Sequence, residues 1–447
     1  MSDRTDQAMN TLLAELRRLQ VLYAKARPAS AQAYEAACTV QPGGTTRSNL
    51  HLFPFPVTID HADGSILTDL DGHTYIDLLS DFAVAMAGHS NDVIRNAIQK
   101  QLTQGISFGG RSEAETELAE IIVARFASIE RVRFTNSGTE ANLYAFLLAR
   151  AITQRPGILM FEGGYLGGAM SFATSDPRLR APFDFITVPY NDIEAFDAAI
   201  SAHGSRLACV ATELMLNSGG CIQADGAFIR HVENVCRNRG ILFLVDEVMT
   251  SRLHVAGLQA LYGVRPDITT LGKIIGGGLS IGAIGGRSDI LKKFDLRSED
   301  PLFHNGSFNN NVLSMRAGAA SLRHVLTESG LSHTNSLGES LRIGMNADLA
   351  SAALPLSWTG MGSVMALHIG REAPTRFMPH PAEKPLRALL HMDALLKGYW
   401  IAPRGMLALS VENTPSQLED FRSLFRTFTG KYEDLIRALV PTTIGAA

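Results

Sequence analysis

The middle of this chain alternates short apolar runs with stretches of helical pattern. Six runs have the character of strands, at residues 131–137, 157–163, 183–190, 206–214, 240–248 and 267–272. Several are almost continuously apolar, which is typical of strands that helices cover on both faces. Because strands that alternate with helices pair through right-handed crossovers, we predict an α/β fold with a mostly parallel sheet.

The two ends of the chain have other patterns. The sequence SILTDLDGHTYIDLLS at 65–80 predicts a hairpin, and helical runs occur near 312–327 and 381–397. Residues 414–417, Thr-Pro-Ser-Gln, form a capping box before a last amphipathic helix. We expect the two ends to pack together as a smaller α+β domain.

The length of 447 residues is too great for one small core. We therefore predict a large domain at residues 80–322. The smaller domain is assigned to residues 1–79 and 323–447.

Composition excludes several classes of protein. The net charge of −4 offers no basic surface for nucleic acid, and no apolar run is long enough to span a bilayer. The N-terminal segment mixes acidic and basic side chains, so it predicts an amphipathic helix ending at Pro28 and not a secretory signal. The cysteines, which show no metal-binding spacing, are Cys38, Cys209, Cys221 and Cys236. We expect free thiols and a cytoplasmic protein.

Polar residues follow the strands of the predicted sheet, where ligands bind in open α/β folds. Lys273 directly follows the last run and precedes the glycine-rich IIGGG, and Asp246 lies at the end of the apolar part of the run before it. The turn Ser137-Gly138-Thr139 opens a helix, so its free N–H groups and the helix dipole suit a phosphate. Tyr165 has glycines on both sides, which would let its ring stack on a flat ligand.

Each of these residues also has an ordinary explanation. Lys273 alone would most often be a solvated surface lysine, and Ser137 an N-cap. Asp246 would be costly in an apolar strand unless paired, as a metal ligand, a base or the partner of a cationic ring. No cluster at metal-ligand spacing supports a metal.

Pyridoxal phosphate is one molecule that needs all four features. It has a phosphate, a flat ring, a ring nitrogen that works best protonated beside a carboxylate, and an aldehyde that forms a Schiff base with lysine. A lysine in an apolar site has a lowered pKa, so its neutral amine can attack and move protons.

Five segments resemble the ordered motifs of class III (fold type I) pyridoxal-phosphate aminotransferases, over nearly the whole chain: FTNSGTEAN, FEGGYLGG, LVDEVMTSR, TTLGKIIGGG and HNGSFNNN. Within this class the sequence is most similar to β-amino-acid (β-phenylalanine) aminotransferases, and next to glutamate-1-semialdehyde 2,1-aminomutases. The resemblance implies a homodimer with shared active sites.

The resemblance also implies a role for each motif residue. Lys273 would be the Schiff-base lysine, and Asp246 would bind the pyridine nitrogen. Val248 would pack on the ring face opposite Tyr165, and Glu213 would belong to the cofactor site. The phosphate would be held by Ser137, Gly138 and Thr139, and by Ser307 from the neighbouring subunit.

Two arginines also match the β-amino-acid group, Arg47 in GGTTRSN and Arg404 in IAPRGMLALS. The resemblance implies that both bind substrate carboxylates, because guanidinium pairs bidentately with carboxylate. A surface ion pair is the alternative for each.

Other positions depart from the family pattern. Leu166 stands where the family often has histidine, and Leu214 and Leu216 stand where proline and glutamine are usual. These changes affect the pocket and the ring oxygen, and therefore the substrate and the outcome of the reaction.

We predict a transaminase that moves the amino group of a carboxylate-bearing amine, a β-amino acid first, to an α-keto acid by a ping-pong mechanism. An aminomutase or an amino-acid racemase or epimerase on the same fold is the alternative. A non-catalytic cofactor-binding protein is disfavoured by the pair Lys273 and Asp246.

Overall fold

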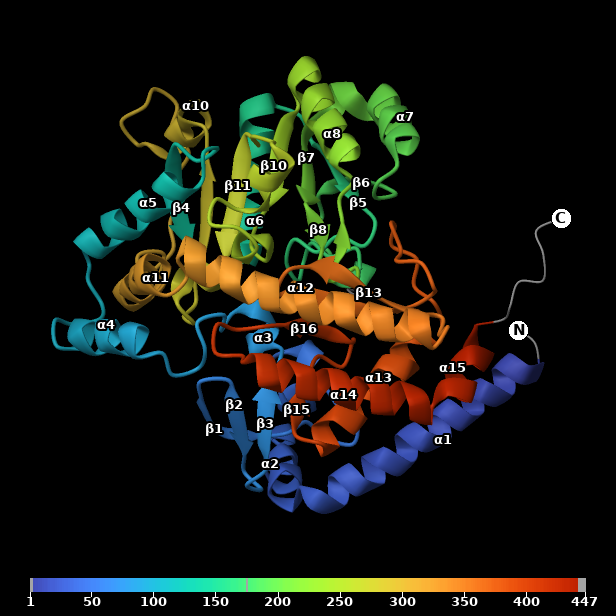
Figure 1. The fold of residues 1–447 in the computed structure, drawn as a ribbon. Coiled ribbons are helices and arrows are strands. Elements are labelled where there is room, and N and C mark those ends of the chain that lie inside the picture. Colours follow the sequence, from blue (N-terminus) through green and yellow to red (C-terminus); the bar gives the residue numbers. More distant parts are fainter. Residues whose placement is uncertain (1–2, 174–175, 441–447) are drawn as a thin grey trace.

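The computed structural model describes residues 3–173 and 176–440 (Figure 1). Its largest sheet has seven strands in the order β4-β12-β11-β10-β7-β5-β6. These strands are β4 (Arg131–Thr135), β5 (Gly157–Phe161), β6 (Asp184–Val188), β7 (Leu207–Glu213), β10 (Leu242–Asp246), β11 (Ile268–Gly272) and β12 (Gly282–Gly286). All are parallel except β12, which is antiparallel to both of its neighbours. The predicted mostly parallel α/β sheet is confirmed.

Helices cover both faces of this sheet, as the continuous apolar strands predict. In β10 Leu244 packs in the cluster that contains α6 (Gly138–Thr153), whereas Val245 packs in the cluster that contains α7 (Ile193–His203) and α8 (Gly226–Arg239). This alternation follows from the two-residue period of a strand. Three further helices lie at the β4 edge of the sheet: α5 (Glu113–Arg125) beside β4, α11 (Val312–His324) packed on α5, and α4 (Asp92–Leu102) packed on α11 (Figure 1).

Strand β12 was not among the predicted strands, because its sequence GAIGG lacks the usual strand composition. The structure explains the glycine at its start. A Cβ atom on Gly282 would collide with the carbonyl oxygen of Ser137. The missing side chain therefore lets the turn before α6 lie directly on the sheet.

The two ends of the chain share one core. The predicted hairpin is present as β2 (Ile66–Asp69) and β3 (Thr74–Asp77), with β1 (Ile59–Asp63) at its edge. The fourth strand of that sheet comes from the other end of the chain, as β15 (Tyr399–Trp400) pairs with β3. This pairing supports our proposal of one small domain built from both ends.

Helices complete this part of the molecule. They are α1 (Asp3–Ala26), α2 (Pro28–Cys38), α12 (Glu328–Ser351), α13 (Glu383–Leu396), α14 (Pro415–Lys431) and α15 (Glu433–Leu439). The predicted capping box at Thr414 and Gln417 is confirmed at the start of α14. Helix α12 runs between the large sheet and the small domain (Figure 1). A second hairpin, β13 (Leu356–Met361) and β14 (Val364–Ile369) with β16 (Met406–Ala408), contributes Val364 and Ala408 to the apolar cluster on the α7 and α8 face of the large sheet.

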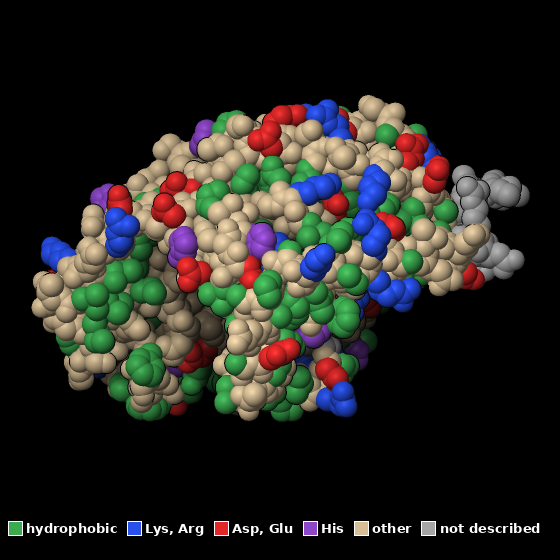
Figure 2. All heavy atoms as spheres, turned by 90° about the horizontal axis from the view of Figure 1, so that it is seen from below, with side chains coloured by type: hydrophobic (Ala, Val, Ile, Leu, Met, Phe, Trp, Pro, Cys, Tyr) green, Lys and Arg blue, Asp and Glu red, His purple; other side chains and the backbone are tan. Residues whose placement is uncertain are grey.

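The surface carries both signs of charge. On the face shown in Figure 2, Lys and Arg side chains lie among acidic and apolar ones. Within the described part of the chain, no helix has the length and apolar character to cross a membrane.

Helix α11 supports the segment that follows β11, the short helix η6 (Lys273–Gly276). A Cβ atom on Gly318 of α11 would collide with the carbonyl oxygen of Ile275, and one on Gly277 would lie 2.5 Å from the carbonyl oxygen of Ala317. The backbone of α11 is therefore in direct contact with the backbone of the segment that follows Lys273.

We expect Gly318→Ala to lower the free energy of unfolding by about 1–3 kcal/mol, because the added methyl group overpacks this contact. The matched control is Gly430→Ala in α14, where a Cβ meets nothing within 4 Å. That change should raise stability by up to about 1 kcal/mol through helix propensity. Urea unfolding of both variants measures the difference, and equal effects would contradict the proposed contact.

Candidate active site

The carboxyl ends of three neighbouring strands bring the main predicted residues together. Asp246 ends β10 and lies opposite Glu213, which ends β7, and Lys273 directly follows β11. The charges of Asp246 and Glu213 both act on the amine of Lys273. The sheet topology alone therefore collects these three ionisable groups.

Lys273 is half-buried and has a left-handed backbone, with φ of 48°. Among the described residues, none forms a hydrogen bond or ion pair with its amine. Burial lowers the pKa of Lys273, whereas Asp246 and Glu213 act in the opposite direction. A lysine with a lowered pKa is more often neutral, which suits a nucleophile and a proton carrier.

The carboxylate of Asp246 is buried and has a neutral hydrogen-bond donor on each oxygen. The backbone N–H of Val248 donates to Oδ1 at 2.7 Å, and the amide of Asn142 donates to Oδ2 at 2.6 Å. Burial raises the pKa of Asp246 to about 6, against the effect of these donors and of Lys273. The carboxylate is thus ionised at neutral pH.

The predicted phosphate turn lies against the strand end that precedes Lys273. Ser137 is the N-cap of α6 and accepts a hydrogen bond from the N–H of Glu140 at 3.1 Å, so its ordinary capping role is present. A Cβ atom on Gly138 would lie 2.7 Å from Val248 Cγ2, and one on Gly272 3.3 Å from Val248 Cγ1. A larger residue than glycine would therefore not fit at position 138 without displacing Val248.

Glu213 holds the loop that carries Tyr165. Its Oε2 accepts from the backbone N–H of Tyr165 at 2.7 Å, and its Oε1 accepts from the Asn217 amide at 2.9 Å. Burial raises the pKa of Glu213 to about 7. Tyr165 itself stays 37% exposed, so its ring is free to contact a ligand. Thr139 lies under the same loop, because a Cβ on Gly167 would be 2.6 Å from its Oγ1.

The residues that depart from the family pattern are apolar and buried. Leu166 packs in the cluster beneath α6, and Leu214 and Leu216 pack on the opposite face of the sheet. The next residue after Leu216 is polar. Asn217 is buried, and its Oδ1 has no hydrogen-bond partner among the described residues. Asn142 and Asn217 were both missed from the sequence, although the motif FTNSGTEAN contains the first.

The two predicted arginines lie near each other but in different states. Arg47 forms an ion pair with Asp81 at 2.6 Å, and both side chains are partly exposed. Arg404 has no carboxylate partner among the described residues, and its buried Nε has no acceptor. Both guanidinium groups lie over the ring of Phe82, at 5.3 Å for Arg47 and 5.5 Å for Arg404. Their charges also act on Tyr165.

Phe82 and Asp81 belong to a turn with an unusual backbone. All four residues of α3 (Ser80–Ala83) are left-handed, with φ of 49°, 48°, 53° and 73°. Such a conformation costs about 1–2 kcal/mol per residue. The carboxylate of Asp77 accepts from the N–H of Leu79 at 2.7 Å and of Ser80 at 3.0 Å, which fixes the turn. Backbone strain that the surroundings enforce is typical of functional sites.

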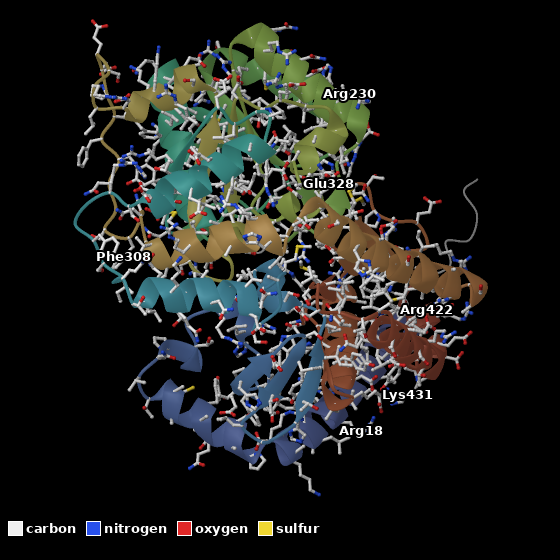
Figure 3. The ribbon with its side chains drawn as sticks, turned by 60° about the vertical axis from the view of Figure 1, so that its left-hand side comes forward. Arg18, Arg230, Phe308, Glu328, Arg422 and Lys431 are labelled. Carbon is white, nitrogen blue, oxygen red and sulfur yellow. The ribbon has the colours of Figure 1, made fainter. Side chains whose placement is uncertain are left out.

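Among the described residues Ser307 has no hydrogen bond to this group, although Asn309 of the same loop accepts one from the Asn136 side chain at 2.9 Å. Ser307 is exposed in the loop before α11, next to Phe308, which is 64% exposed and lies at the periphery of the molecule (Figure 3).

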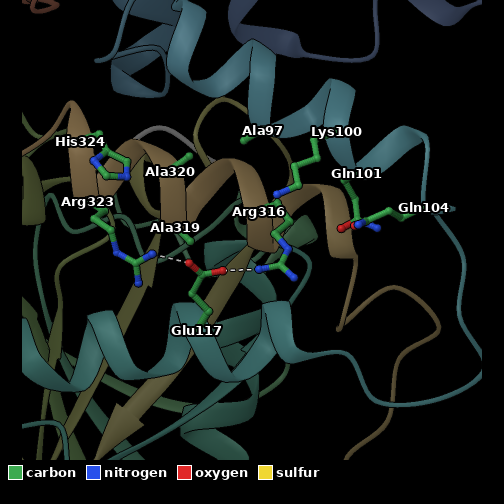
Figure 4. Close-up of a pocket in the computed structure, with 10 residues that line it drawn as sticks. All are labelled: Ala97, Lys100, Gln101, Gln104, Glu117, Arg316, Ala319, Ala320, Arg323 and His324. Carbon is green, nitrogen blue, oxygen red and sulfur yellow. Dashed lines mark hydrogen bonds and ion pairs between the residues drawn. The ribbon is translucent and has the colours of Figure 1, made fainter.

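A separate cavity of about 250 Å³ lies between α4, α5 and α11 (Figure 4). Glu117 pairs with both Arg316 and Arg323, and with Lys100 the cavity is lined by more positive than negative charges. None of the predicted site residues lines it.

The group formed at the strand ends fits pyridoxal phosphate chemically. It offers an amine with a lowered pKa, an ionised buried carboxylate and an exposed aromatic ring. It also offers the backbone N–H groups at the start of α6, where Gly138 lies. No cluster of possible metal ligands occurs among the residues described.

Known proteins are similar to the chain over most of its length. The family model "Aminotransferase class-III" matches residues 48–412. The β-phenylalanine transaminase of Variovorax paradoxus is 38% identical over 433 residues, which is 97% of this chain and 99% of that protein. Its solved structure has a TM-score of 0.93 and covers 95% of this chain and 99% of that one.

Two other relatives are also similar. An uncharacterised aminotransferase of Schizosaccharomyces pombe is 40% identical over 405 residues, covering 90% of this chain and 92% of that protein. A glutamate-1-semialdehyde 2,1-aminomutase of Methanocella arvoryzae is 34% identical over 415 residues, covering 88% and 94%. The chain therefore belongs to the class III aminotransferase family and is a pyridoxal-phosphate-dependent enzyme of fold type I.

Proposed function

We propose that this aminotransferase takes the amino group of a β-amino acid and passes it to an α-keto acid. The observation that carries the proposal is the presence of two arginines, Arg47 and Arg404, that share the ring of Phe82. The similarity to the β-phenylalanine transaminase of Variovorax paradoxus supports the choice of substrate.

Two arginines solve a geometric problem. In a β-amino acid the carboxylate lies one carbon further from the reacting amine than in an α-amino acid or its keto acid. One guanidinium does not easily serve both spacings. The two arginines also differ in the energy needed to bind a substrate carboxylate. Arg47 must first break its ion pair with Asp81, whereas Arg404 has no such ion pair to break.

The chain's own residues would perform the chemistry in defined roles. The cofactor supplies an electron-withdrawing ring that stabilises negative charge at the carbon bearing the amino group. Asp246 would hold the proton on the ring nitrogen, and Lys273 would bind the cofactor and accept the proton that leaves that carbon. Val248 and Tyr165 would pack on the two faces of the ring, and Glu213 would position Tyr165.

The phosphate would lie on Ser137, Gly138 and Thr139, with Ser307 from a second copy of the chain. A homodimer is supported by the apolar side chains exposed around that serine. They are Leu102, Ile106, Phe108, Phe303 and Phe308. The two loops that carry them are adjacent, because the Asn310 amide donates to the carbonyl oxygen of Gly110 at 3.4 Å.

We also propose a cytoplasmic location, which the free state of all four cysteines supports.

A glutamate-1-semialdehyde-type aminomutase is the second candidate, because the relative from Methanocella arvoryzae carries that activity in its name. An aminomutase returns the nitrogen to another carbon of the same molecule and needs no keto acid. An amino-acid racemase or epimerase would also need none.

A panel of amine donors tests the proposal directly. With pyruvate or 2-oxoglutarate as acceptor, we expect turnover with an aromatic or aliphatic β-amino acid and little with the amine that lacks the carboxylate. The product amino acid is measured by chromatography. Turnover without any keto acid would favour an aminomutase or racemase instead.

Lys273→Ala should remove the visible absorbance that arises when the cofactor is bound to lysine, because no other amine takes its position at the end of β11. Phosphate contacts remain, so the variant should still bind some cofactor. The absorbance spectrum and a cofactor assay measure the two properties separately. An unchanged spectrum would assign the bond to a different lysine.

Arg47→Ala and Arg404→Ala should affect the two half-reactions unequally. Loss of one partner of a charge-assisted pair costs about ten- to a hundredfold in kcat/KM. Single-turnover absorbance with donor alone and with keto acid alone measures each half-reaction. Changes below about threefold in both variants would mean that these arginines do not hold carboxylates.

A further inference from the structure

The buried amide of Asn142 connects the candidate cofactor site to the strand beside it. Asn142 lies in α6, only 1% exposed, and its Nδ2 donates to Asp246 Oδ2 at 2.6 Å. Its Oδ1 accepts from the hydroxyl of Thr270 at 2.8 Å. Thr270 lies in β11 and is paired with Asp246 in the sheet register.

The contacts of Asn142 permit only one orientation of its amide. Nδ2 faces two acceptors, the carboxylate of Asp246 and the carbonyl oxygen of Gly138 at 3.1 Å. A reversed amide would place its oxygen against both of these oxygens, which is unfavourable at a buried site. The hydroxyl of Thr270 donates to Oδ1 and so stabilises the orientation that presents the N–H to Asp246.

Asp246 depends on this donor because its other contacts are few. Its second hydrogen bond comes from the N–H of Val248, and the ionisable groups that act with it are Lys273, Glu213, Glu247 and Tyr165. Two neighbouring carboxyl groups disfavour the charged form of Asp246, as does its burial. An amide carries no proton that titrates, so its support for the charged form is constant over pH.

We propose that Asn142, oriented by Thr270, is a positioning residue that keeps the carboxylate of Asp246 ionised and in one orientation for the pyridine nitrogen of the cofactor. The inference rests on the role proposed above for Asp246. It assigns to Asn142 and Thr270 the function of supporting the Asp246 carboxylate, which is separate from holding the fold or the phosphate turn.

The test measures the affinity of the apoprotein for pyridoxal phosphate across pH, by equilibrium dialysis. Wild-type affinity should fall as pH falls through about 6, where Asp246 takes up a proton. Loss of the Asn142 donor raises the pKa of Asp246, so in Asn142→Ala this fall should begin at higher pH. At neutral pH the dissociation constant should rise about ten- to a hundredfold, the range for a hydrogen bond to a charged group.

Thr270 offers a milder and better matched set of variants. Thr270→Val keeps the volume but removes the hydroxyl, and should weaken binding about two- to tenfold with the same direction of pH shift. Thr270→Ser should restore wild-type behaviour. The control is Thr269→Val, since Thr269 is equally buried in the same strand but bonds to Ser128 on the other side of the sheet.

The inference is overturned if Asn142→Ala and Thr270→Val shift the pH at which cofactor affinity falls no further than Thr269→Val does. If Asn142→Ala does not fold, the two Thr270 variants decide alone. Because the phosphate of the cofactor also titrates near pH 6 in every variant, only differences between variants are used. Asp246→Asn separates the role of Asp246 from that of Asn142 and Thr270. If this variant keeps the wild-type fall of cofactor affinity with pH, the proposed role of Asp246 itself is wrong.

Discussion

A buried carboxylate beside a half-buried amine dominates the design of this enzyme. Asp246 and Lys273 lie at the ends of adjacent strands, where burial pushes the pKa of the acid up and that of the amine down. Each shift brings its group closer to the range where protons move readily at physiological pH. The sheet, the glycines behind Lys273 and the hydrogen bonds on Asp246 all keep these two groups in place against their cost of burial.

Much of the fold could be predicted because its main signal is local. Short strand-like runs, several of them almost continuously apolar, predicted six of the seven strands of the large sheet, and polar residues at their ends, such as Lys273 and Asp246, predicted the edge where the ligand binds. Strand β12 escaped prediction because its first glycine, Gly282, is explained only by a contact with Ser137, more than a hundred residues earlier in the chain. Helix α12 has no strong apolar period that would have identified it.

The partners of the site residues could not be predicted for a related reason. The sequence shows Arg47 and Asp246 as charged residues in suitable motifs, but their contacts with Asp81 and Asn142 join segments that only the folded chain brings together. An asparagine such as Asn142 looks the same in the sequence whether it lies on the surface or in the core. Whether a polar residue is a partner or a solvated side chain is decided by tertiary packing, which a motif does not encode.

The left-handed turn α3 sets a limit on how this pocket can change. Its four residues hold a conformation that glycine or asparagine would adopt at lower cost, yet Phe82 contacts two guanidinium groups there. Glycine at position 82 would relax the backbone and also remove the ring that both arginines contact. Stability and selectivity thus favour different residues at the same positions, so adaptation to a new substrate here would have to trade one for the other.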